Sequence, residues 1–527
     1  MSLAYGTQQP CDRAQLSAHA RPYPSTAGTR RWVLAASILG SSLAFIESSV
    51  VNLALPSIQS GLGTTSTGVQ WVVNAYLLVL VAFMLIGGAL GDRYGLRRVF
   101  TLGTALFGAA ALGCALAPSA PLLIAARLAQ GLGGALLVPA SLAMISAHFD
   151  ARERGRAIGT WAGASALTTA IGPVLGGWLV DHWGWPAVFL IMPPLAALTL
   201  AIAARIPASP VATERRLDYF GGVLTAVALG LLVYGLVNPA TPPQRTALLL
   251  LALLVGGAFL WHESRFGAPM LPLSLFRSRI FAGANLMTLL LYFALTGVLY
   301  FLPFNLIQVQ GYTAARAGAA LLPFAVIMGL GSTFAGDSIR RHDPRVVLTI
   351  GPMITAAGFV ALAVPGAGVS LASFLPGIVV VGIGMTVGVA PLTTVVMSSG
   401  AEPGIASAVN NTAARLGGVL AIAALTAFAV LEFAGALADR LAAAGVPAGL
   451  AEQLLADASR LAGLAPPSGT PPALAAAVGD AVARSYVQTF RVVAGLCAVL
   501  AAVSGLIAWF TLADSGLTVR ERASTGR

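Results

Sequence analysis

Long apolar segments recur from Trp32 to Leu512, and they constrain the fold of this chain more than any other feature. A helix needs about 20 apolar residues to cross the hydrocarbon core of a bilayer, and these segments reach that length. Only 9% of the 527 residues are charged, whereas a soluble globular domain carries about 25%. The polar surface is too small for a soluble protein, so the sequence predicts an integral membrane protein with many spans.

Clusters of Gly, Pro and Arg divide the apolar segments into separate helices. The fourteen expected ranges are 32–55, 69–90, 99–117, 121–145, 157–179, 186–204, 219–238, 246–262, 280–302, 316–336, 345–364, 371–391, 405–431 and 486–511. The predicted fold class is therefore an all-α polytopic membrane protein. An even number of spans places both ends of the chain on one side of the membrane.

Arginines are clustered at alternate ends of the expected helices. The 30 basic residues are all arginines. Clusters precede the first helix and follow the even-numbered ones, for example at Arg30 and Arg31, at Arg97 and Arg98, and at Arg340 to Arg345. Basic residues concentrate on the cytoplasmic side of membrane proteins, so both termini are expected in the cytoplasm. The net charge of +11 is thus explained by the arginine clusters that set the orientation in the membrane, and it does not indicate a nucleic-acid partner.

Residue types typical of catalytic and cofactor sites are sparse. The three cysteines, Cys11, Cys114 and Cys497, are far apart and form no metal-binding or disulfide pattern. No phosphate-cradling GxxxxGK[ST] motif is present, so ATP is not expected to drive the protein. The expectations are no cofactor, no metal and no enzymatic activity. The first ~30 residues are polar and rich in Pro, Ser and Arg, which predicts a disordered tail rather than a signal peptide.

One loop occurs twice in the sequence. "GALGDRYGLRR" runs from Gly88 to Arg98, and "GDSIRRHDPRV" runs from Gly336 to Val346. When the two stretches are aligned, Gly88 matches Gly336. Arg93 then matches Arg341, and Arg97 matches Arg345. A repeated loop indicates a duplicated unit, which is how many transporters are built.

The first copy of this loop resembles the cytoplasmic signature loop of the major facilitator superfamily. Three further stretches resemble its fourteen-helix drug:proton antiporter branch: "FIESSVVNLALPSI" from Phe45, "RLAQGLGGALLVPASLAMI" from Arg127 and "GTWAGASALTTAIGPVLGGWL" from Gly159. The resemblance covers about residues 32–511. It implies a cytoplasmic gate loop made of Gly88, Asp92, Arg93, Gly95, Arg97, Arg98, Arg341 and Arg345. In the second copy Arg340 replaces the Asp and Asp343 replaces the second Gly, so the gate is expected to be asymmetric.

The resemblance also implies an organisation of the chain. The expected parts are a disordered cytoplasmic tail (1–31), a six-helix bundle (32–204), an inserted helix pair (205–265), a second six-helix bundle (266–511) and a cytoplasmic tail (512–527). Within the second bundle, 432–485 forms the one sizeable external loop. Its amphipathic spacing predicts short helices on the outer surface, with a dedicated binding domain as the alternative.

Glu47 is the one carboxylate placed deep inside an expected span. An ionisable group there is costly and marks a functional site by default. The resemblance implies proton coupling at Glu47, where the branch usually has Asp, and at Arg127. The alternatives are a structural polar group at Glu47 and an arginine that reaches the membrane interface at Arg127. A Glu47–Arg127 coupling is possible because both helices belong to the first bundle.

Two further sets of residues are candidates. The antiporter-type helix contains small residues and a proline that allow close packing and a kink, and in the family it seals against the other half: Gly159, Gly163, Gly172, Pro173, Gly176 and Gly177. Polar residues on apolar spans can line a substrate cavity or equally join helices: Gln70, Asn74, Asn285, Tyr292, Thr296, Asn410 and Asn411.

These observations predict a proton-driven exporter of a lipophilic drug or natural product, acting by alternating access. Its expected partners are the lipid bilayer, a small lipophilic substrate and protons, and it is expected to be a monomer. Two alternatives remain, a facilitator-type importer or metabolite carrier and a non-transporting membrane sensor.

Overall fold

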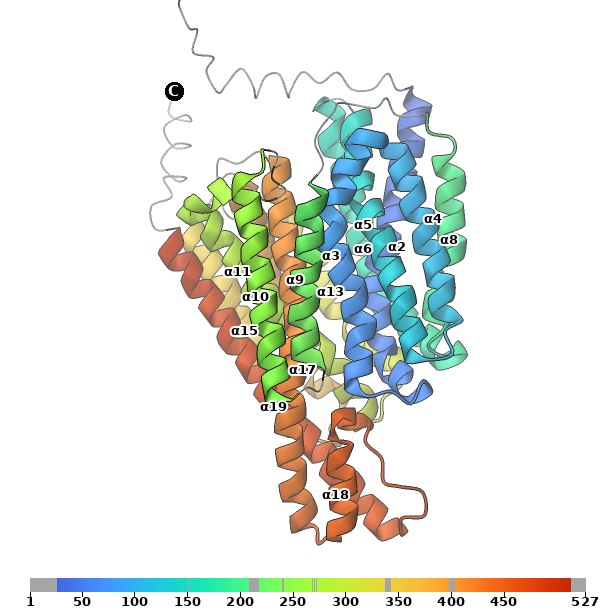
Figure 1. Cartoon of the computed structure of the whole chain (residues 1–527), viewed down its shortest axis with the longest axis vertical. Helices are drawn as coiled ribbons and strands as arrows, with labels where there is room; N and C mark the ends of the chain where they lie inside the picture. The colour runs from blue at the N-terminus through green and yellow to red at the C-terminus, as the bar shows by residue number, and fades with distance from the viewer. Residues whose placement is uncertain are drawn as a thin grey trace, which may run out of the picture.

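The described part of the chain is helical. The computed structural model describes residues 26–149, 151–207, 218–238, 241–267, 269, 271, 273–336, 343–397 and 403–512, and no strand occurs among them. The expected residues 1–25 and 513–527 of the two tails lie outside these ranges. Figure 1 shows the helices side by side along one axis, with the start of α2 and the end of α19 toward the same end.

The first bundle consists of seven helical segments. They are α2 (Ala27–Gly61), α3 (Ser66–Tyr94), α4 (Leu96–Ala115), α5 (Ala120–His148), α6 (Ala151–Trp183), α7 (Ala187–Leu190) and α8 (Met192–Ala203). The helix α2 starts five residues earlier than expected because the Thr26 side chain caps it by accepting from the N–H of Thr29 at 3.2 Å. Pro193 and Pro194 cannot donate backbone hydrogen bonds, which explains the break between α7 and α8.

The later described helices are named here by the expected division, as the inserted pair and the second bundle. The pair is α9 (Tyr219–Val237) and α10 (Pro242–Arg265). The second bundle contains η1 (Leu273–Arg277), α11 (Arg279–Phe304), η2 (Asn305–Val309), α12 (Ala314–Ala320), α13 (Leu322–Gly336), α15 (Pro344–Ala363), η3 (Leu371–Ser373), α16 (Leu375–Met397), α17 (Pro403–Ala443), α18 (Ala448–Ala456), η4 (Ala458–Gly463) and α19 (Pro472–Thr511).

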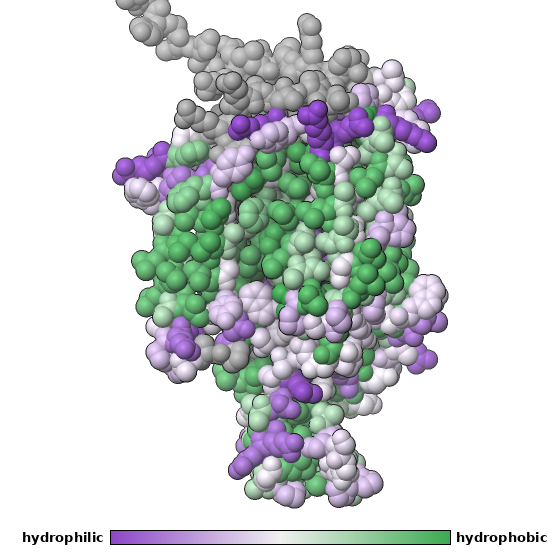
Figure 2. Space-filling view, turned by 45° about the vertical axis from the view of Figure 1, so that its right-hand side comes forward, coloured by the Kyte–Doolittle hydropathy of each residue, from purple (hydrophilic) through white to green (hydrophobic). Residues whose placement is uncertain are grey.

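Helical structure lies in all fourteen expected ranges, so the all-α class is confirmed. Eleven helices among the described residues are long and apolar enough to cross a membrane, and the split segments Ala187–Ala203 and Ala314–Gly329 are shorter apolar helices. Figure 2 shows the resulting apolar belt between two hydrophilic bands. The α10 helix contributes exposed leucines to such a surface, among them Leu253 and Leu254. The chain is a multi-pass membrane protein.

The segment expected as a surface loop is partly a continuation of two membrane helices, with the short helices α18 and η4 between them. The helix α17 has 41 residues and α19 has 40, so each is about 60 Å long. Together with α18 they project beyond the lower hydrophilic band, as Figures 1 and 2 show. The expectation of short surface helices is wrong for 437–443, because bilayer thickness limits only the apolar part of α17. Its helix ends where Gly445 adopts φ +67 and Pro447 follows.

The two bundles meet along specific helices. The helix α6 packs on α12 and α13, α3 packs on α17, and α2 contacts α11. The inserted pair lies beside this seam, because α9 packs on both α3 and α17. The contacts across the seam decide which end of the molecule is closed.

Candidate functional site

The Glu47 side chain is completely buried in the first bundle. Its exposed fraction is 0%, and that of its partner Arg127 on α5 is 2%. Arg127 Nη1 donates a hydrogen bond to Glu47 Oε1 and forms a salt bridge with it. Gln130 Nε2, also on α5, donates to Glu47 Oε2 at 3.0 Å. Both carboxylate oxygens are therefore held by one face of α5.

Arg127 is itself fixed by a third helix. Its Nε donates to the backbone carbonyl of Val72 on α3 at 2.8 Å, and its Nη1 also donates to Gln130 Oε1 at 2.8 Å. The guanidinium carbon lies 4.4 Å from the centroid of the Tyr76 ring. A cation over an aromatic face is stabilised by the ring quadrupole. We call Glu47, Arg127, Gln130 and Tyr76 the Glu47 network.

The sequence suggested the Glu47–Arg127 pair but not its two other members. Gln130 lies three residues after Arg127, a spacing that places both side chains on one face of a helix. That spacing is a signal that sequence analysis can use. Tyr76 gave no such signal, because a tyrosine in an apolar helix is an ordinary core residue. Its packing against Arg127 follows only from how α3 and α5 meet.

The glycines of the antiporter-type helix face two neighbours. A Cβ at Gly176 would lie 2.7 Å from Val50 Cγ1, so this glycine admits close packing of α6 against α2. Gly172 and Gly177 are also buried, and Gly177 faces the other bundle: a Cβ there would lie 2.2 Å from the carbonyl oxygen of Ala314 on α12. Gly159 and Gly163 belong to α6, but their surroundings lie outside the described part.

The contact between α6 and α12 is also close at a glycine of α12. A Cβ at Gly318 on α12 would lie 2.2 Å from the carbonyl oxygen of Pro173. The Asp181 carboxylate near the end of α6 accepts from the first N–H groups of α12, from Ala314 at 2.9 Å and from Ala315 at 2.7 Å. A carboxylate at a helix N-terminus satisfies free N–H groups and complements the helix dipole. We call this α6–α12 contact the seal; it joins the bundles at the end that carries α18.

A second set of contacts reinforces closure at that end. Gln59 near the end of α2 donates from Nε2 to the carbonyl oxygen of Arg460 in η4 at 3.0 Å. Its Oε1 accepts from Gln308 Nε2 in η2 at 3.2 Å. The first bundle is thus hydrogen-bonded to two segments of the second.

The expected gate loop is only partly described. Gly95 forms the turn between α3 and α4 with φ +95, a conformation that suits glycine. A Cβ on Gly88 would lie 3.7 Å from Pro139 of α5, which is an ordinary van der Waals contact. Arg93 and Arg98 are exposed, while Arg97 and Arg345 each donate to a backbone carbonyl. Arg341 and the side chain of Asp92 lie outside the described part.

The expected cavity residues of the first bundle are buried and incompletely bonded. Gln70 is 2% exposed and Asn74 is 0% exposed. Gln70 Oε1 and both polar atoms of the Asn74 amide have no hydrogen-bond partner among the described residues. Buried polar atoms without partners are costly, so they are candidates for contact with a ligand or water.

The expected cavity residues of the second bundle differ in their contacts. Asn410 joins helices, since its Oδ1 accepts from the Thr288 hydroxyl at 2.6 Å. Asn285 donates to the carbonyl of Phe281 at 2.8 Å in its own helix. Tyr292 and Thr296 are half-buried on α11, and Asn411 is exposed on α17. The interhelical role left open by the sequence therefore describes Asn410.

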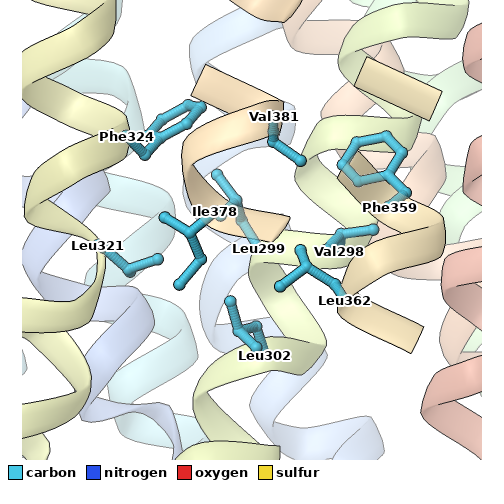
Figure 3. Close-up of a pocket in the computed structure, with 9 residues that line it drawn as sticks. All are labelled: Val298, Leu299, Leu302, Leu321, Phe324, Phe359, Leu362, Ile378 and Val381. Atoms are coloured by element: carbon cyan, nitrogen blue, oxygen red, sulfur yellow. The ribbon is translucent and has the colours of Figure 1, made fainter. Parts of the chain in front are cut away.

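A small pocket lies elsewhere, inside the second bundle. Figure 3 shows apolar side chains converging on it from several helices, including Val298 of α11, Phe324 of α13, Phe359 of α15 and Val381 of α16. Its nine lining side chains are all apolar. Its lining offers no group that can bind a proton.

Two helical bundles, a buried acid–base pair inside one of them and a glycine-rich seam between them define a membrane transporter rather than an enzyme. The family model described as Major Facilitator Superfamily matches residues 37–422. The chain belongs to this superfamily.

Curated relatives extend the similarity over most of the chain. The Multidrug resistance protein Stp of Mycobacterium tuberculosis (strain CDC 1551 / Oshkosh) is 35% identical over 405 residues, which are 75% of each chain. The Tetracenomycin C resistance and export protein of Streptomyces glaucescens is 30% identical over 501 residues, covering 93% of this chain and 92% of that protein. The Multidrug efflux pump LfrA of Mycolicibacterium smegmatis is 32% identical over 475 residues, covering 84% and 94%.

Solved structures support the fold. A bacterial homolog of the human lysosomal transporter Spinster, crystallised in an inward-facing and unoccupied conformation, matches with a TM-score of 0.63. The match covers 92% of this chain and 99% of that chain at 17% sequence identity. At this identity the similarity concerns the arrangement of helices only.

Proposed function

We propose that the protein exports a lipophilic drug or natural product in exchange for protons. The observation that carries the proposal is the carboxylate of Glu47, which is fully buried yet held at both oxygens by Arg127 and Gln130. A buried carboxylate that can lose its partner is suited to bind and release a proton. Relatives named for multidrug resistance, multidrug efflux and tetracenomycin C export support the direction of transport.

The contacts suggest how a proton would change the first bundle. Ionised Glu47 attracts Arg127 and ties α2 to α5. Protonation removes the negative charge, so the ion pair is lost, while Arg127 keeps its hydrogen bond to Val72 and its place over Tyr76. The link between α2 and α5 then weakens without leaving the guanidinium unbonded. Because α2 also packs on α6 and α11, its release would reach the seam between the bundles.

The seal supplies the second element of alternating access. The conformation described here is closed at the α18 end by Gly177, Gly318 and Asp181. Opening there requires the α6–α12 contact to separate as the bundles rock, which is how repeat-built transporters expose a central site. The network and the seal lie within one chain, so a monomer is sufficient for the cycle.

We place the α18 end outside the cell and the two ends of the chain in the cytoplasm. Arg30, Arg97, Arg205 and Arg345 all belong to helix ends or loops at the end opposite α18. Basic residues at that end support a cytoplasmic position by the positive-inside rule.

Transport into everted membrane vesicles tests the proposal. The substrate is a compound to which the expressed protein confers resistance in a growth screen. Uptake should require an acidic vesicle interior, and Glu47→Gln should abolish the dependence on the proton gradient. Glu153→Gln is the matched control, because Glu153 forms an exposed pair with Arg30. Uptake that survives collapse of the gradient, or wild-type uptake by Glu47→Gln, would contradict the proposal.

A further inference from the structure

Arg415 places a positive charge inside the membrane at the seam between the two bundles. It lies on α17, four and eight residues before Val419 and Ala423, so the three share one face of the helix. Val419 and Ala423 form a cluster with Leu78 of α3 and Val233 of α9. That face of α17 therefore looks toward the first bundle and the inserted pair.

Two tyrosines are the electrostatic neighbours of Arg415. Tyr76 on α3 and Tyr292 on α11 belong to two of the helices on which α17 packs, and both lie within electrostatic range of the Arg415 guanidinium. Neither tyrosine hydroxyl has a hydrogen-bond partner within the described ranges, and no described carboxylate pairs with Arg415. A cation inside a membrane protein is costly unless it has a partner, and it marks a substrate or ion pathway by default.

The described residues supply five guanidinium donors and two phenolic hydroxyls at this point. No carboxylate among them forms a salt bridge with Arg415. An arginine fork matches an oxygen anion with two acceptor atoms better than any other side chain does. A cationic substrate would be repelled by the same charge. The missing partner is therefore best supplied from outside the protein.

We propose that Arg415, Tyr76 and Tyr292 form a subsite for the acidic group of the substrate, which is an aromatic organic anion carrying a carboxylate or an ionised phenol. Arg415 provides the charge and hydrogen bonds. The two tyrosines can donate to the same oxygens and contribute aromatic surface, and they come from opposite sides of the seam. A ligand bound there would touch both bundles.

Tyr76 also connects this subsite to the Glu47 network. The face of its ring receives the Arg127 guanidinium at 4.4 Å, while its phenol interacts electrostatically with Arg415. An anion bound near Tyr76 adds a negative charge close to Glu47, and a like charge disfavours the ionised carboxylate. Occupancy of the subsite and the charge state of Glu47 should therefore depend on each other. This link rests on the proposed function, whereas the subsite itself can be tested separately.

A binding measurement on purified full-length protein tests the subsite. The protein is kept in micelles of an uncharged detergent, and the fluorescence anisotropy of fluorescein is titrated at pH 7.5. Fluorescein carries a carboxylate and an ionised phenol on an aromatic frame, and rhodamine 6G is a cationic ester with a related frame. We expect saturable binding of fluorescein and none of rhodamine 6G. This comparison on the wild-type protein does not depend on any variant.

Variants then locate the binding. Arg415→Gln should weaken fluorescein binding roughly 10- to 100-fold, the effect of losing a charge-assisted hydrogen bond. Arg415→Lys should recover most of the affinity because it keeps the charge. Arg491→Gln is the matched control, since Arg491 donates only to backbone carbonyls at the end of α15, those of Ala363 and Val364. A thermal melt confirms that each variant is folded.

Several results would overturn the subsite: no saturable binding of fluorescein, a preference for rhodamine 6G, or equal affinity in Arg415→Gln. An anionic phospholipid could present the same chemistry. If phospholipid that co-purifies with the wild type is lost in Arg415→Gln and fluorescein does not displace it, the occupant is a lipid and the substrate assignment fails. The binding measurement uses no proton gradient, so a failure of proton coupling in vesicles is distinguished from a failure of the subsite.

Discussion

Arg97 and Arg345 make the same contact in the two bundles. Arg97 Nη2 on α4 donates at 3.2 Å to the carbonyl oxygen of Ala204, the C-cap residue that follows α8. Arg345 Nε on α15 donates at 2.9 Å to the carbonyl oxygen of Leu512, the C-cap residue that follows α19. Each arginine thus ties the start of the third helix of its bundle to the end of the last one. The repeated loop of the sequence corresponds to a repeated interaction in space.

Removing either arginine should have a similar effect on stability. Arg97→Gln and Arg345→Gln should each cost about 1 kcal/mol, because a cation at a helix C-terminus and its hydrogen bond to a carbonyl are lost. Thermal unfolding in detergent measures the effect. Arg98→Gln is the control, since Arg98 is exposed and should leave the melting temperature unchanged. A loss confined to Arg345→Gln would show that the two contacts are not equivalent.

Shortening the acid should impair the Glu47 network without removing its charge. In Glu47→Asp the carboxylate is drawn back by one methylene, so it cannot reach Arg127 and Gln130 together unless α2 moves. We expect proton-driven uptake to persist at a rate about tenfold lower, consistent with the loss of one charge-assisted hydrogen bond. Initial rates in everted vesicles measure this. An Asp variant with the full wild-type rate would show that the second hydrogen bond is dispensable.

A double variant tests whether Arg127 stabilises the protein by pairing with the buried charge of Glu47. Arg127→Gln leaves the Glu47 carboxylate buried without its cation, which should cost about 3–5 kcal/mol of stability. The double variant Glu47→Gln, Arg127→Gln has no buried charge at this point and should melt higher than Arg127→Gln alone. Neither variant should show gradient-driven uptake. Equal melting temperatures for the single and double variants would argue against the ion pair.

The seal should open when a methyl group is inserted into it. In Gly177→Ala or Gly318→Ala the new Cβ would meet a backbone carbonyl at 2.2 Å, which neither helix can accommodate without moving apart. We expect single cysteines introduced near the α18 end to react faster with a membrane-impermeant maleimide. Gly256→Ala in α10 is the matched control, because nothing lies within 4 Å of its Cβ position. Unchanged labelling in both seal variants would show that the contact does not limit opening.

Asp181 and Asp343 cap helices in different settings and form a natural comparison. Asp181 bonds across the seam to α12, whereas Asp343 caps its own helix α15 by accepting from the N–H of Arg345 at 2.9 Å. Replacing either by Ala should cost about 1 kcal/mol of stability. Only Asp181→Ala should also increase maleimide labelling at the α18 end. If both variants increase labelling equally, general destabilisation explains the effect.

The sequence predicts the helical class and most of the spans because bilayer thickness and apolar length are linked directly. It also identifies Glu47, since one acid in an apolar span is conspicuous. It does not predict that Glu47 bonds Gln130 as well as Arg127, because such geometry depends on how α2 and α5 are rotated about their axes. Nor does it predict that Gly172 and Gly177, on one helix, face α2 and α12 respectively.

The sequence does not single out Arg415 as a functional residue. Its position in an apolar span is as conspicuous as that of Glu47, but an arginine in such a span is also explained by a side chain that reaches the membrane interface. That this part of α17 packs on α3 of the first bundle follows only from the arrangement of the helices. The ends of α17 and α19 were missed for a different reason, because hydropathy marks where a membrane ends and not where a helix does.

The projecting parts of α17 and α19 should move together with the membrane-embedded parts of the same helices. The helix α17 runs without interruption from the seam, where Arg415 and Val419 lie, to the turn before α18, and α19 returns from the projecting part into the second bundle. A small tilt within the bilayer is therefore magnified at the tip. Fluorophores on α18 and on the α2–α3 turn would convert each transport cycle into a change in energy transfer, visible in a single molecule outside the membrane.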